Sequence, residues 1–203
     1  MVYTHDLKSC TERFEGSSPS PGTMGLFYTR KGDKGLSHIG KTKVSKTCLE
    51  VEVLGQLDEL NSIIGVLKSQ KVSKELENIL HQIQENLFII QAQVANIMMG
   101  GKFKTPEFKN LKITEVEKII DRIENKLKPA RGFVISGTNQ TSSWLDFLRA
   151  KSRNVERSVL KMGKKVEKLS PGIKAYLNRL SSLLFALARW EARGKKEKNP
   201  KYK

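Results

Sequence analysis

From residue 49 onward, apolar side chains recur at intervals of three and four residues, which places them on one face of an α-helix. The segments 49–69, 74–101, 114–127 and 141–164 follow this spacing, and so does the chain after Ser170. Five such helices joined by short connections predict an all-α fold, an up-and-down five-helix bundle. The series contains no internal repeat, so we expect a single domain.

Polar and flexible residues mark several of the expected helix ends. Ser73 precedes an apolar-periodic run and is expected to cap the second helix. Gly100 and Gly101 are expected to end that helix, because glycine adopts the left-handed conformation common at helix C-termini. Ser170 is expected to cap the last helix, with Pro171 in its first turn.

The chain is strongly basic, with 37 Lys and Arg residues against 21 Asp and Glu residues and a net charge of +16. Such a surplus attracts polyanions, and nucleic acids, membrane surfaces and polyphosphates are all compatible with it. A basic helical nucleic-acid-binding protein is therefore one alternative. Because the sequence has no recognised nucleic-acid-binding motif and its lysines are spread along the chain, we do not expect nucleic acid as a partner.

Several other classes lack support in the sequence. Cys10 and Cys48 form no CxxC pair, which argues against a disulfide framework and favours a reducing, cytoplasmic setting. The three histidines lack the spacing of a metal site, so no protein-bound metal is expected. No apolar run approaches the roughly 20 residues that span a bilayer, and the N-terminal residues lack a signal-peptide pattern. We therefore expect no membrane partner.

The two ends of the chain differ in composition from the helical part. Residues 1–23 lack periodicity and end in a Ser/Pro/Gly cluster, which predicts a disordered leader or a mis-assigned start with Met24 as the first residue. Residues 194–203 are rich in lysine, which predicts a disordered tail. Residues 24–193 would then form the folded domain.

The stretch "YTRKGDKG", residues 28–35, combines two glycines with three cationic side chains. Gly32 and Gly35 would let backbone N–H groups approach an anion closely. The stretch matches neither GxxxxGK[ST] nor GxGxxG. It is therefore either an anion-binding loop or a basic surface turn.

In the fourth expected helix, three charged residues lie along the edge of the apolar stripe. Arg149, Arg153 and Glu156 follow i, i+4, i+7 spacing. They form either an ion-pair ladder on a solvated face or a guanidinium pair that binds phosphate oxygens and is oriented by Glu156.

Polar residues also interrupt the apolar faces of the first and last helices. Asp58 lies beside the apolar stripe of the first helix, where an acidic side chain is usually a structural partner for an arginine. One face of the last helix mixes polar groups with an aromatic ring, which is compatible with a pocket wall. This face comprises Asn178, Ser182, Phe185 and Arg189.

Five sequence blocks occur in one order along the chain: "YTRKGDKG", "VEVLGQLDELNSIIG", "FVISG", "RAKSRNVERSV" and "YLNRLSSLLFALARW". In these blocks the chain resembles the PduO-type ATP:cob(I)alamin (corrinoid) adenosyltransferase family, from about Tyr28 to Trp190. The resemblance implies a ferritin-like five-helix bundle that assembles as a homotrimer, with ATP bound between subunits.

The resemblance also implies the reaction and its ligands. The 5′-deoxyadenosyl group of ATP passes to Co(I) of a reduced corrinoid, giving triphosphate and adenosylcobalamin or adenosyl-cobyrinic acid diamide. ATP is the co-substrate, Mg²⁺ is bound mainly through ATP, and the corrinoid is the substrate. A corrinoid reductase and an acceptor enzyme would be further partners.

The resemblance assigns the nucleotide-binding residues, most of which lie in the opening loop and the fourth helix. In the opening loop and after it they are Thr29, Arg30, Lys31, Gly32, Asp33, Ser37, His38 and Lys46. In the helical part they are Arg153, Asn154, Val155, Glu156, Arg157 and, on the adenosine side, Asn178.

The residues implied in catalysis are Arg153, Glu156, Arg149, Asp58 and Phe133. Asp58 and Arg149 match a pair that bridges neighbouring subunits. Phe133 matches the aromatic residue that displaces the lower axial ligand of the corrinoid.

The chain departs from the family pattern at several places, including the segment "TCLE" after Lys46 and the lysine tail in place of an aromatic-bearing extension. Asn154 stands in place of an arginine, the turn "SGTN" at residues 136–139 replaces a turn with two glycines, and Ser182 replaces an aspartate. The alternative within the family is therefore a non-catalytic carrier of corrinoid or ATP with the same fold.

Overall fold

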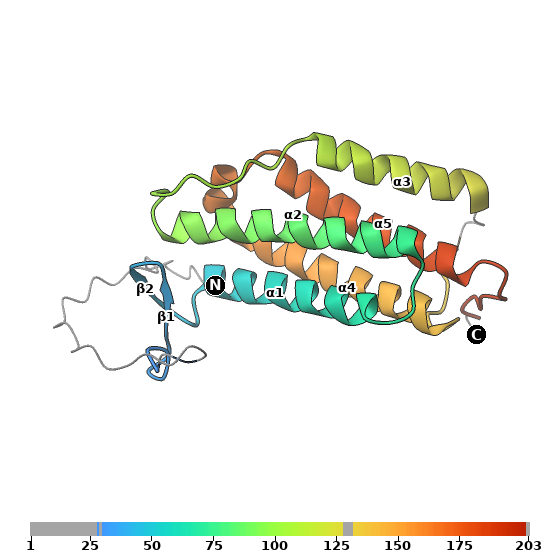
Figure 1. Cartoon of the computed structure of the whole chain (residues 1–203), viewed down its shortest axis with the longest axis horizontal. Helices are drawn as coiled ribbons and strands as arrows, with labels where there is room; N and C mark the ends of the chain where they lie inside the picture. The colour runs from blue at the N-terminus through green and yellow to red at the C-terminus, as the bar shows by residue number, and fades with distance from the viewer. Residues whose placement is uncertain (1–27, 29, 128–131, 202–203) are drawn as a thin grey trace, which may run out of the picture.

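A computed structural model describes residues 28, 30–127 and 132–201 of the chain, so the expected leader at residues 1–23 lies outside it. Five α-helices lie alongside one another, and together with one 3₁₀ helix they form most of this part (Figure 1). They are α1 (Leu49–Lys68), α2 (Lys74–Met98), α3 (Leu111–Leu127), α4 (Gln140–Lys161), the 3₁₀ helix η1 (Gly163–Lys168) and α5 (Gly172–Ala192). The predicted all-α class is confirmed.

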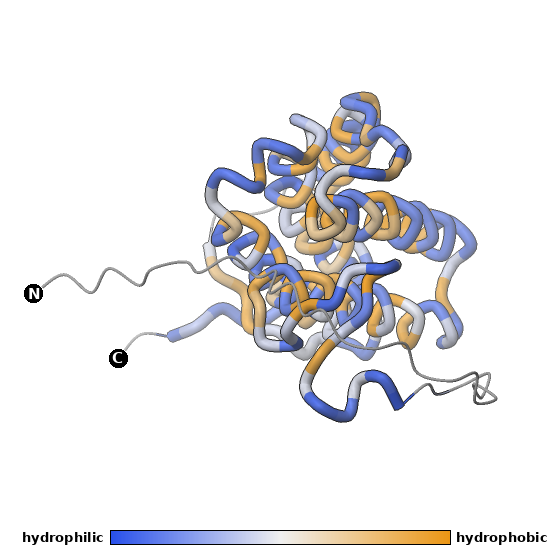
Figure 2. Tube along the Cα trace, turned by 90° about the vertical axis from the view of Figure 1, so that its left-hand side faces the viewer, coloured by the Kyte–Doolittle hydropathy of each residue, from blue (hydrophilic) through white to orange (hydrophobic). Residues whose placement is uncertain are grey.

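The helices pack through the apolar faces that the sequence pattern predicts. Figure 2 shows hydrophobic and hydrophilic residues alternating along each helix, as expected of amphipathic helices. Helix α5 packs against both α3 and α4, while α1 packs against α2 and α4. Tyr176 of α5 is fully buried, and its hydroxyl accepts a hydrogen bond of 3.1 Å from the Asn86 side chain of α2. This bond satisfies the one polar group of a large core residue.

A short β-hairpin precedes the helices, and the periodicity of the sequence did not predict it. Strands β1 (Leu36–Ile39) and β2 (Thr42–Ser45) pair antiparallel, with Leu36 opposite Ser45. Gly40 in the turn has a φ of 59°, and a Cβ there would lie only 2.9 Å from Met99 Sδ. The hairpin therefore lies close to the C-terminus of α2, at the end of the molecule opposite the C-terminus of the chain (Figure 1).

Most of the predicted helix ends are confirmed. Ser73 caps α2 by accepting a hydrogen bond from the Leu76 backbone, and Gly100 and Gly101 follow α2 with φ of 76° and 75°. Helix α4 ends at Lys161 instead of residue 164, because Gly163 adopts a φ of 59° and η1 begins there.

The prediction that Ser170 caps α5 is wrong. Its hydroxyl oxygen instead accepts hydrogen bonds of 2.9 Å from Gln93 Nε2 and 3.2 Å from the Phe108 backbone. Gln93 Oε1 in turn accepts from the Ser170 backbone at 2.8 Å. Ser170 therefore ties the start of α5 to α2 and to the loop before α3.

The tail makes defined contacts where the composition led us to expect disorder. Within residues 194–201, Glu197 forms an ion pair with Arg189 of α5. The backbone oxygen of Lys198 accepts a hydrogen bond of 2.8 Å from the Ile135 backbone, which forms an isolated antiparallel bridge. This part of the tail therefore lies against the end of the helical domain.

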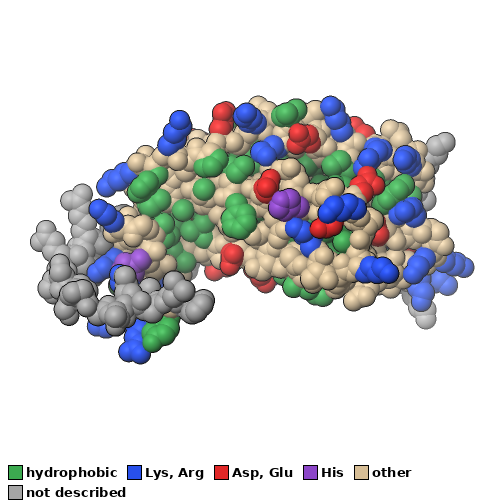
Figure 3. Space-filling model, viewed as in Figure 1, with side chains coloured by type: hydrophobic (Ala, Val, Ile, Leu, Met, Phe, Trp, Pro, Cys, Tyr) green, Lys and Arg blue, Asp and Glu red, His purple; other side chains and the backbone are tan. Residues whose placement is uncertain are grey.

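The surface of the described part carries its charges in a scattered arrangement. On the face drawn in Figure 3, Lys and Arg side chains are spread over several helices and alternate with Asp and Glu. None of the described helices is both long and apolar enough to cross a membrane.

An ion pair between a buried carboxylate and an exposed lysine joins the start of α1 to η1. Glu50 is only 4% exposed and pairs with Lys165 of η1. Burial raises the pKa of Glu50, but the hydrogen bond from Lys165 and smaller favourable contacts outweigh this effect and lower the pKa from its ordinary value of 4.5. A lowered pKa contributes stability above the unfolded value, and this contribution is lost as the pH falls through the folded value.

Replacement of Lys165 by methionine tests this ion pair. Lys165→Met removes the cationic partner of a buried carboxylate, so we expect a loss of about 1–3 kcal/mol in the free energy of unfolding at about pH 7. The loss should shrink at acidic pH, once the pH has fallen through the lowered folded pKa of Glu50 and the carboxylate is protonated. Urea denaturation at both pH values measures the effect, with Lys164→Met, an exposed neighbour, as the control. Equal stability of the two variants at both pH values would contradict the prediction.

Candidate functional site

A cavity of about 340 Å³ lies between α3, α4 and α5. Helix α3 contributes mainly apolar side chains to its wall, whereas α4 and α5 contribute cations and small polar groups. The residues from α4 and α5 that matter for its chemistry are Arg149, Arg153, Arg189, Ser182 and Phe185. The two arginines predicted from their spacing in α4 therefore share the wall of one cavity.

Two of the cavity arginines share a buried acidic partner. Asp146 of α4 is 6% exposed and forms an ion pair with Arg189 of α5. Its other oxygen lies 3.8 Å from Arg149 Nε. The sequence analysis did not single out Asp146, although its position three residues before Arg149 is compatible with a pair on one helix face.

Arg189 has a fixed position in the cavity wall. It is 7% exposed, and its guanidinium lies 5.1 Å from the centre of the Phe185 ring, a cation–π distance. Nε of Arg189 and Nε of Arg149 are buried and have no hydrogen-bond partner in the described part of the chain. A buried N–H without a partner costs free energy, so the packing of this wall leaves two polar groups unsatisfied within the described part.

The predicted nucleotide-binding residues Glu156 and Asn178 lie together on neighbouring helices. Asn178 Nδ2 donates a hydrogen bond of 3.0 Å to Glu156 Oε1, and Asn178 Oδ1 accepts one of 3.0 Å from Arg179. Arg179 is held in turn by Glu117 of α3 at 2.9 Å. The two contacts fix the orientation of the Asn178 amide. Glu156 and Asn178 therefore form an ordered pair of polar side chains on α4 and α5.

The remaining residues of the "RNVER" run face other directions. Asn154 and Arg157 line a groove of about 370 Å³ between α1 and α4, and Arg157 donates to the Asn154 side chain. Val155 is 2% exposed and belongs to the hydrophobic core, so its side chain offers a ligand little surface. Arg153 thus lies in the cavity wall and Val155 in the core, while Asn154 and Arg157 line a separate groove and Glu156 pairs with Asn178.

The opening loop folds back on itself next to the hairpin. Gly35 and Gly32 form a turn with an N–H···O distance of 3.2 Å, and Lys46 donates its backbone N–H to the Gly35 oxygen at 2.9 Å. A Cβ on Gly32 would lie 2.9 Å from Lys46 Nζ, so the lysine side chain lies directly against this glycine. The structure therefore brings Lys46 and the loop together, while the role of Lys46 in phosphate binding stays a prediction.

The structure also gives the positions of other predicted residues in the opening segment. Arg30 has a φ of 57°, unusual for a residue with a side chain, and its guanidinium lies 5.3 Å from the Tyr28 ring centre. Ser37 and His38 lie on β1, while Thr29 is outside the described residues.

Comparison with known proteins identifies the family of this chain. The family model described as "Cobalamin adenosyltransferase" matches residues 27–191. This chain belongs to the cobalamin adenosyltransferase family.

Individual relatives give the same assignment. A corrinoid adenosyltransferase of Citrobacter freundii is 34% identical over 169 residues, which are 83% of this chain and 96% of the relative. The corrinoid adenosyltransferase PduO of Salmonella typhimurium is 32% identical over 166 residues, which are 81% of this chain but only 49% of that relative.

A solved structure also matches. It is a variant of a PduO-type ATP:corrinoid adenosyltransferase from Lactobacillus reuteri, complexed with cobalamin and ATP. It superposes with a TM-score of 0.79 at 27% identity and covers 87% of this chain and 99% of that chain.

Two predicted catalytic residues of this cobalamin adenosyltransferase family member are exposed. Phe133 is 76% exposed in the segment before α4, and Asp58 is exposed on α1. Within the described part of the chain Arg149 pairs with Asp146 and not with Asp58. The predicted contact between Asp58 and Arg149 of a neighbouring subunit stays a prediction.

The unusual turn "SGTN" has a structural role in this family member. Asn139 caps α4 by accepting a 2.8 Å hydrogen bond from the Ser142 backbone, and Ser142 Oγ accepts from the Asn139 backbone. Asn139 Nδ2 also donates to the Glu191 backbone oxygen at 2.8 Å. This asparagine therefore fixes the start of α4 against the end of α5.

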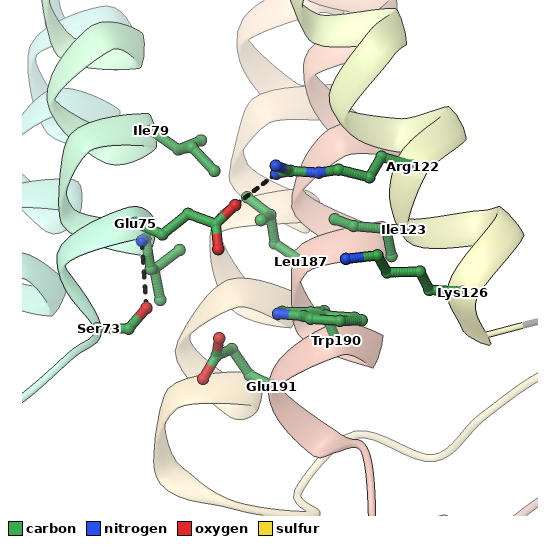
Figure 4. Close-up of a pocket in the computed structure, with 10 residues that line it drawn as sticks. Ser73, Glu75, Ile79, Arg122, Ile123, Lys126, Leu187, Trp190 and Glu191 are labelled. Carbon is green, nitrogen blue, oxygen red and sulfur yellow. Dashed lines mark hydrogen bonds and ion pairs between the residues drawn. The ribbon is translucent and has the colours of Figure 1, made fainter.

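A second, smaller hollow lies between the start of α2, α3 and the end of α5, with a volume of about 80 Å³ (Figure 4). Glu75 and Arg122 form an ion pair across it, and Lys126 lies 5.6 Å from the Trp190 ring centre. Burial raises the pKa of Glu191 in this hollow; Arg193 opposes the shift, and Glu75 adds to it. Because its cationic groups already have partners, we interpret this hollow as structural.

A glutamine at position 191 tests the raised pKa. A raised pKa means that the contribution of Glu191 to stability is complete below its unfolded value of 4.5 and is lost as the pH rises through the folded value. We expect Glu191→Gln to raise the melting temperature by roughly 1–3 °C at about pH 7 and to have no effect near pH 4. Scanning calorimetry at both pH values measures this, with Glu167→Gln on η1 as the matched control. A destabilised variant at neutral pH would contradict the prediction.

Proposed function

We propose that this chain transfers the 5′-deoxyadenosyl group of ATP to the Co(I) centre of a reduced corrinoid. The observation that carries the proposal is the cavity wall formed by Arg149 and Arg153, close in sequence to the Glu156–Asn178 pair. Family membership supports it, since this constellation lies within the matched residues 27–191.

The proposed chemistry needs no nucleophilic side chain. The electron pair of Co(I) forms a bond to C5′ of ATP, the C5′–O bond breaks, and its electrons leave with triphosphate. Cobalt is thereby oxidised by two electrons and the adenosyl carbon is reduced. The protein has to position both substrates and stabilise the charge that develops on the leaving group.

The cationic residues provide that stabilisation in the proposal. Arg153 would bind phosphate oxygens, and the opening loop with Lys46 would surround the triphosphate with backbone N–H groups and positive charge. Mg²⁺ would accompany the nucleotide, held mainly through phosphate oxygens as is usual for this ion. Asp33, exposed in the opening loop, is an acidic group suited to complete its ligand shell. Glu156 and Asn178 would bind the adenosine part.

We further propose a homotrimer with ATP between subunits. The opening loop and the C-terminal tail lie at opposite ends of the molecule (Figure 1). In the described part, no residue before Ile120 lines the cavity, so the opening loop of the same chain does not reach it. An opening loop from a neighbouring subunit would complete the site. Asp58, exposed on α1, would then pair with Arg149 of that neighbour.

Phe133 has the environment expected of a residue that contacts the corrinoid. Its ring is largely exposed, so it is available to a large, flat ligand. In the proposal it displaces the lower axial ligand and excludes water from cobalt.

Arg153→Ala is the direct test of the proposed function. We expect a loss of roughly 100-fold or more in kcat/KM, because one charge-assisted contact to the leaving group is removed. The assay mixes protein, chemically reduced cob(I)alamin and Mg-ATP without oxygen and follows the visible spectrum. Lys174→Ala, an exposed cation on α5, is the control. Near-normal activity of Arg153→Ala would reject the assigned role, and an inactive wild type would favour a carrier.

Asp58→Lys tests the subunit arrangement. Reversal of this charge would place two cations together at the proposed interface, so we expect dissociation of the trimer and a loss of activity of at least about tenfold. Light scattering after size-exclusion chromatography measures the mass. An intact, fully active oligomer would contradict the proposed pairing.

A further inference from the structure

The described tail contacts two functional parts of the molecule through adjacent residues. Glu197 pairs with Arg189 in the cavity wall, and Lys198 accepts a backbone hydrogen bond from Ile135, two residues after Phe133. Gly194 allows the chain to turn back after α5, since its φ of 77° is a left-handed conformation. The tail therefore links the cavity arginine to the segment that carries Phe133.

Two acidic residues, one on α4 and one in the tail, fix the guanidinium of Arg189. Its Nη1 donates to Glu197 and its Nη2 donates to Asp146, so each terminal nitrogen has a carboxylate partner. The guanidinium also lies over the Phe185 ring at 5.1 Å. Only Nε remains buried without a partner in the described part.

Within the described part of one subunit, Glu197 completes the balance of charges around Arg149 and Arg189. Arg149 and Arg189 carry two positive charges, and Asp146 and Glu197 carry two negative charges. Without Glu197, a buried arginine would lose half of its charge compensation and Nη1 would lose its partner. The guanidinium would then be free to turn away from Phe185.

We propose that Glu197 is a positioning residue for the corrinoid substrate, acting through Arg189 and Phe185. A corrinoid is a flat, largely apolar macrocycle with carboxamide groups at its edge. An aromatic ring matches the face of the macrocycle, and the exposed ring of Phe185 lies in the cavity wall. Lys198, next to Glu197, accepts the backbone hydrogen bond from Ile135 and so ties the Phe133 segment to the tail. The inference rests on the proposed function, because it assigns the corrinoid to this end of the site.

The test compares Glu197→Gln with Glu167→Gln, an identical chemical change at an exposed position of η1. Glutamine keeps the shape of the side chain and removes its charge. We expect the Kd for cob(II)alamin, measured by its visible spectrum in the presence of Mg-ATP, to rise about tenfold in Glu197→Gln. The KM for cob(I)alamin should rise in parallel, while the KM for ATP and kcat at saturating corrinoid stay within about twofold of wild type.

Three results would overturn the inference. One is an unchanged corrinoid Kd in Glu197→Gln, and another is an equal rise in Glu167→Gln. The third is an equal loss of ATP and corrinoid binding together with a lower melting temperature, which would indicate a purely structural role. Because the Kd requires no turnover, a wild type that binds corrinoid but transfers no adenosyl group would reject the proposed function and leave this comparison decisive.

Discussion

Helices α4 and α5 share the most extensive contact in the described part of the chain, and the positions of the functional groups depend on it. Leu145, Leu148 and Val155 of α4 and Leu184 of α5 are all almost completely buried. Apolar burial of this kind is non-directional, so it stabilises the contact without selecting one rotation of the helices. The polar groups at its edges add that selection, because each has a partner only in one register.

The edges of this contact carry the chemistry of the site. On one side Asp146 and Arg189 form an ion pair between α4 and α5, and further along the helices Glu156 and Asn178 form a hydrogen bond between them. A residue at the edge of a buried face is fixed by the core on one side and remains open to a ligand on the other. Sites built on paired helices therefore gain precision from the same packing that stabilises the fold.

The helices could be predicted from the sequence because their signals are local. Periodicity and capping residues such as Ser73 act over a few positions, so a single stretch of chain contains the whole signal. The hairpin was missed because its strands have four residues each and no long alternation. Ser170 was misjudged for a related reason: its hydroxyl bonds to Gln93, which is 77 residues away. Local capping patterns give no indication of such a partner.

The site was predictable only in part for the same reason. Arg149 and Arg153 stood out because charges at the edge of an apolar stripe need a partner or a ligand. Their environment depends on Asp146 and Arg189, which are 43 residues apart. Glu197 gave no signal at all, since it lies among lysines in a tail whose composition resembles a disordered segment.

The two ends of the chain differ in chemistry in a way that suits the proposed reaction. The opening loop is glycine-rich and cationic, with Lys46 packed against Gly32, and it offers backbone N–H groups and positive charge. The end near the tail presents Phe133 and Phe185, and carboxylates there neutralise the arginines Arg149 and Arg189. A triphosphate is stabilised by the first environment, whereas a flat macrocycle of low charge density is better accommodated by the second. In the proposed trimer, the opening loop of one subunit would face this end of its neighbour. An adenosyl group bound between them would then have its leaving group and its acceptor on opposite sides of C5′, as displacement at this carbon requires.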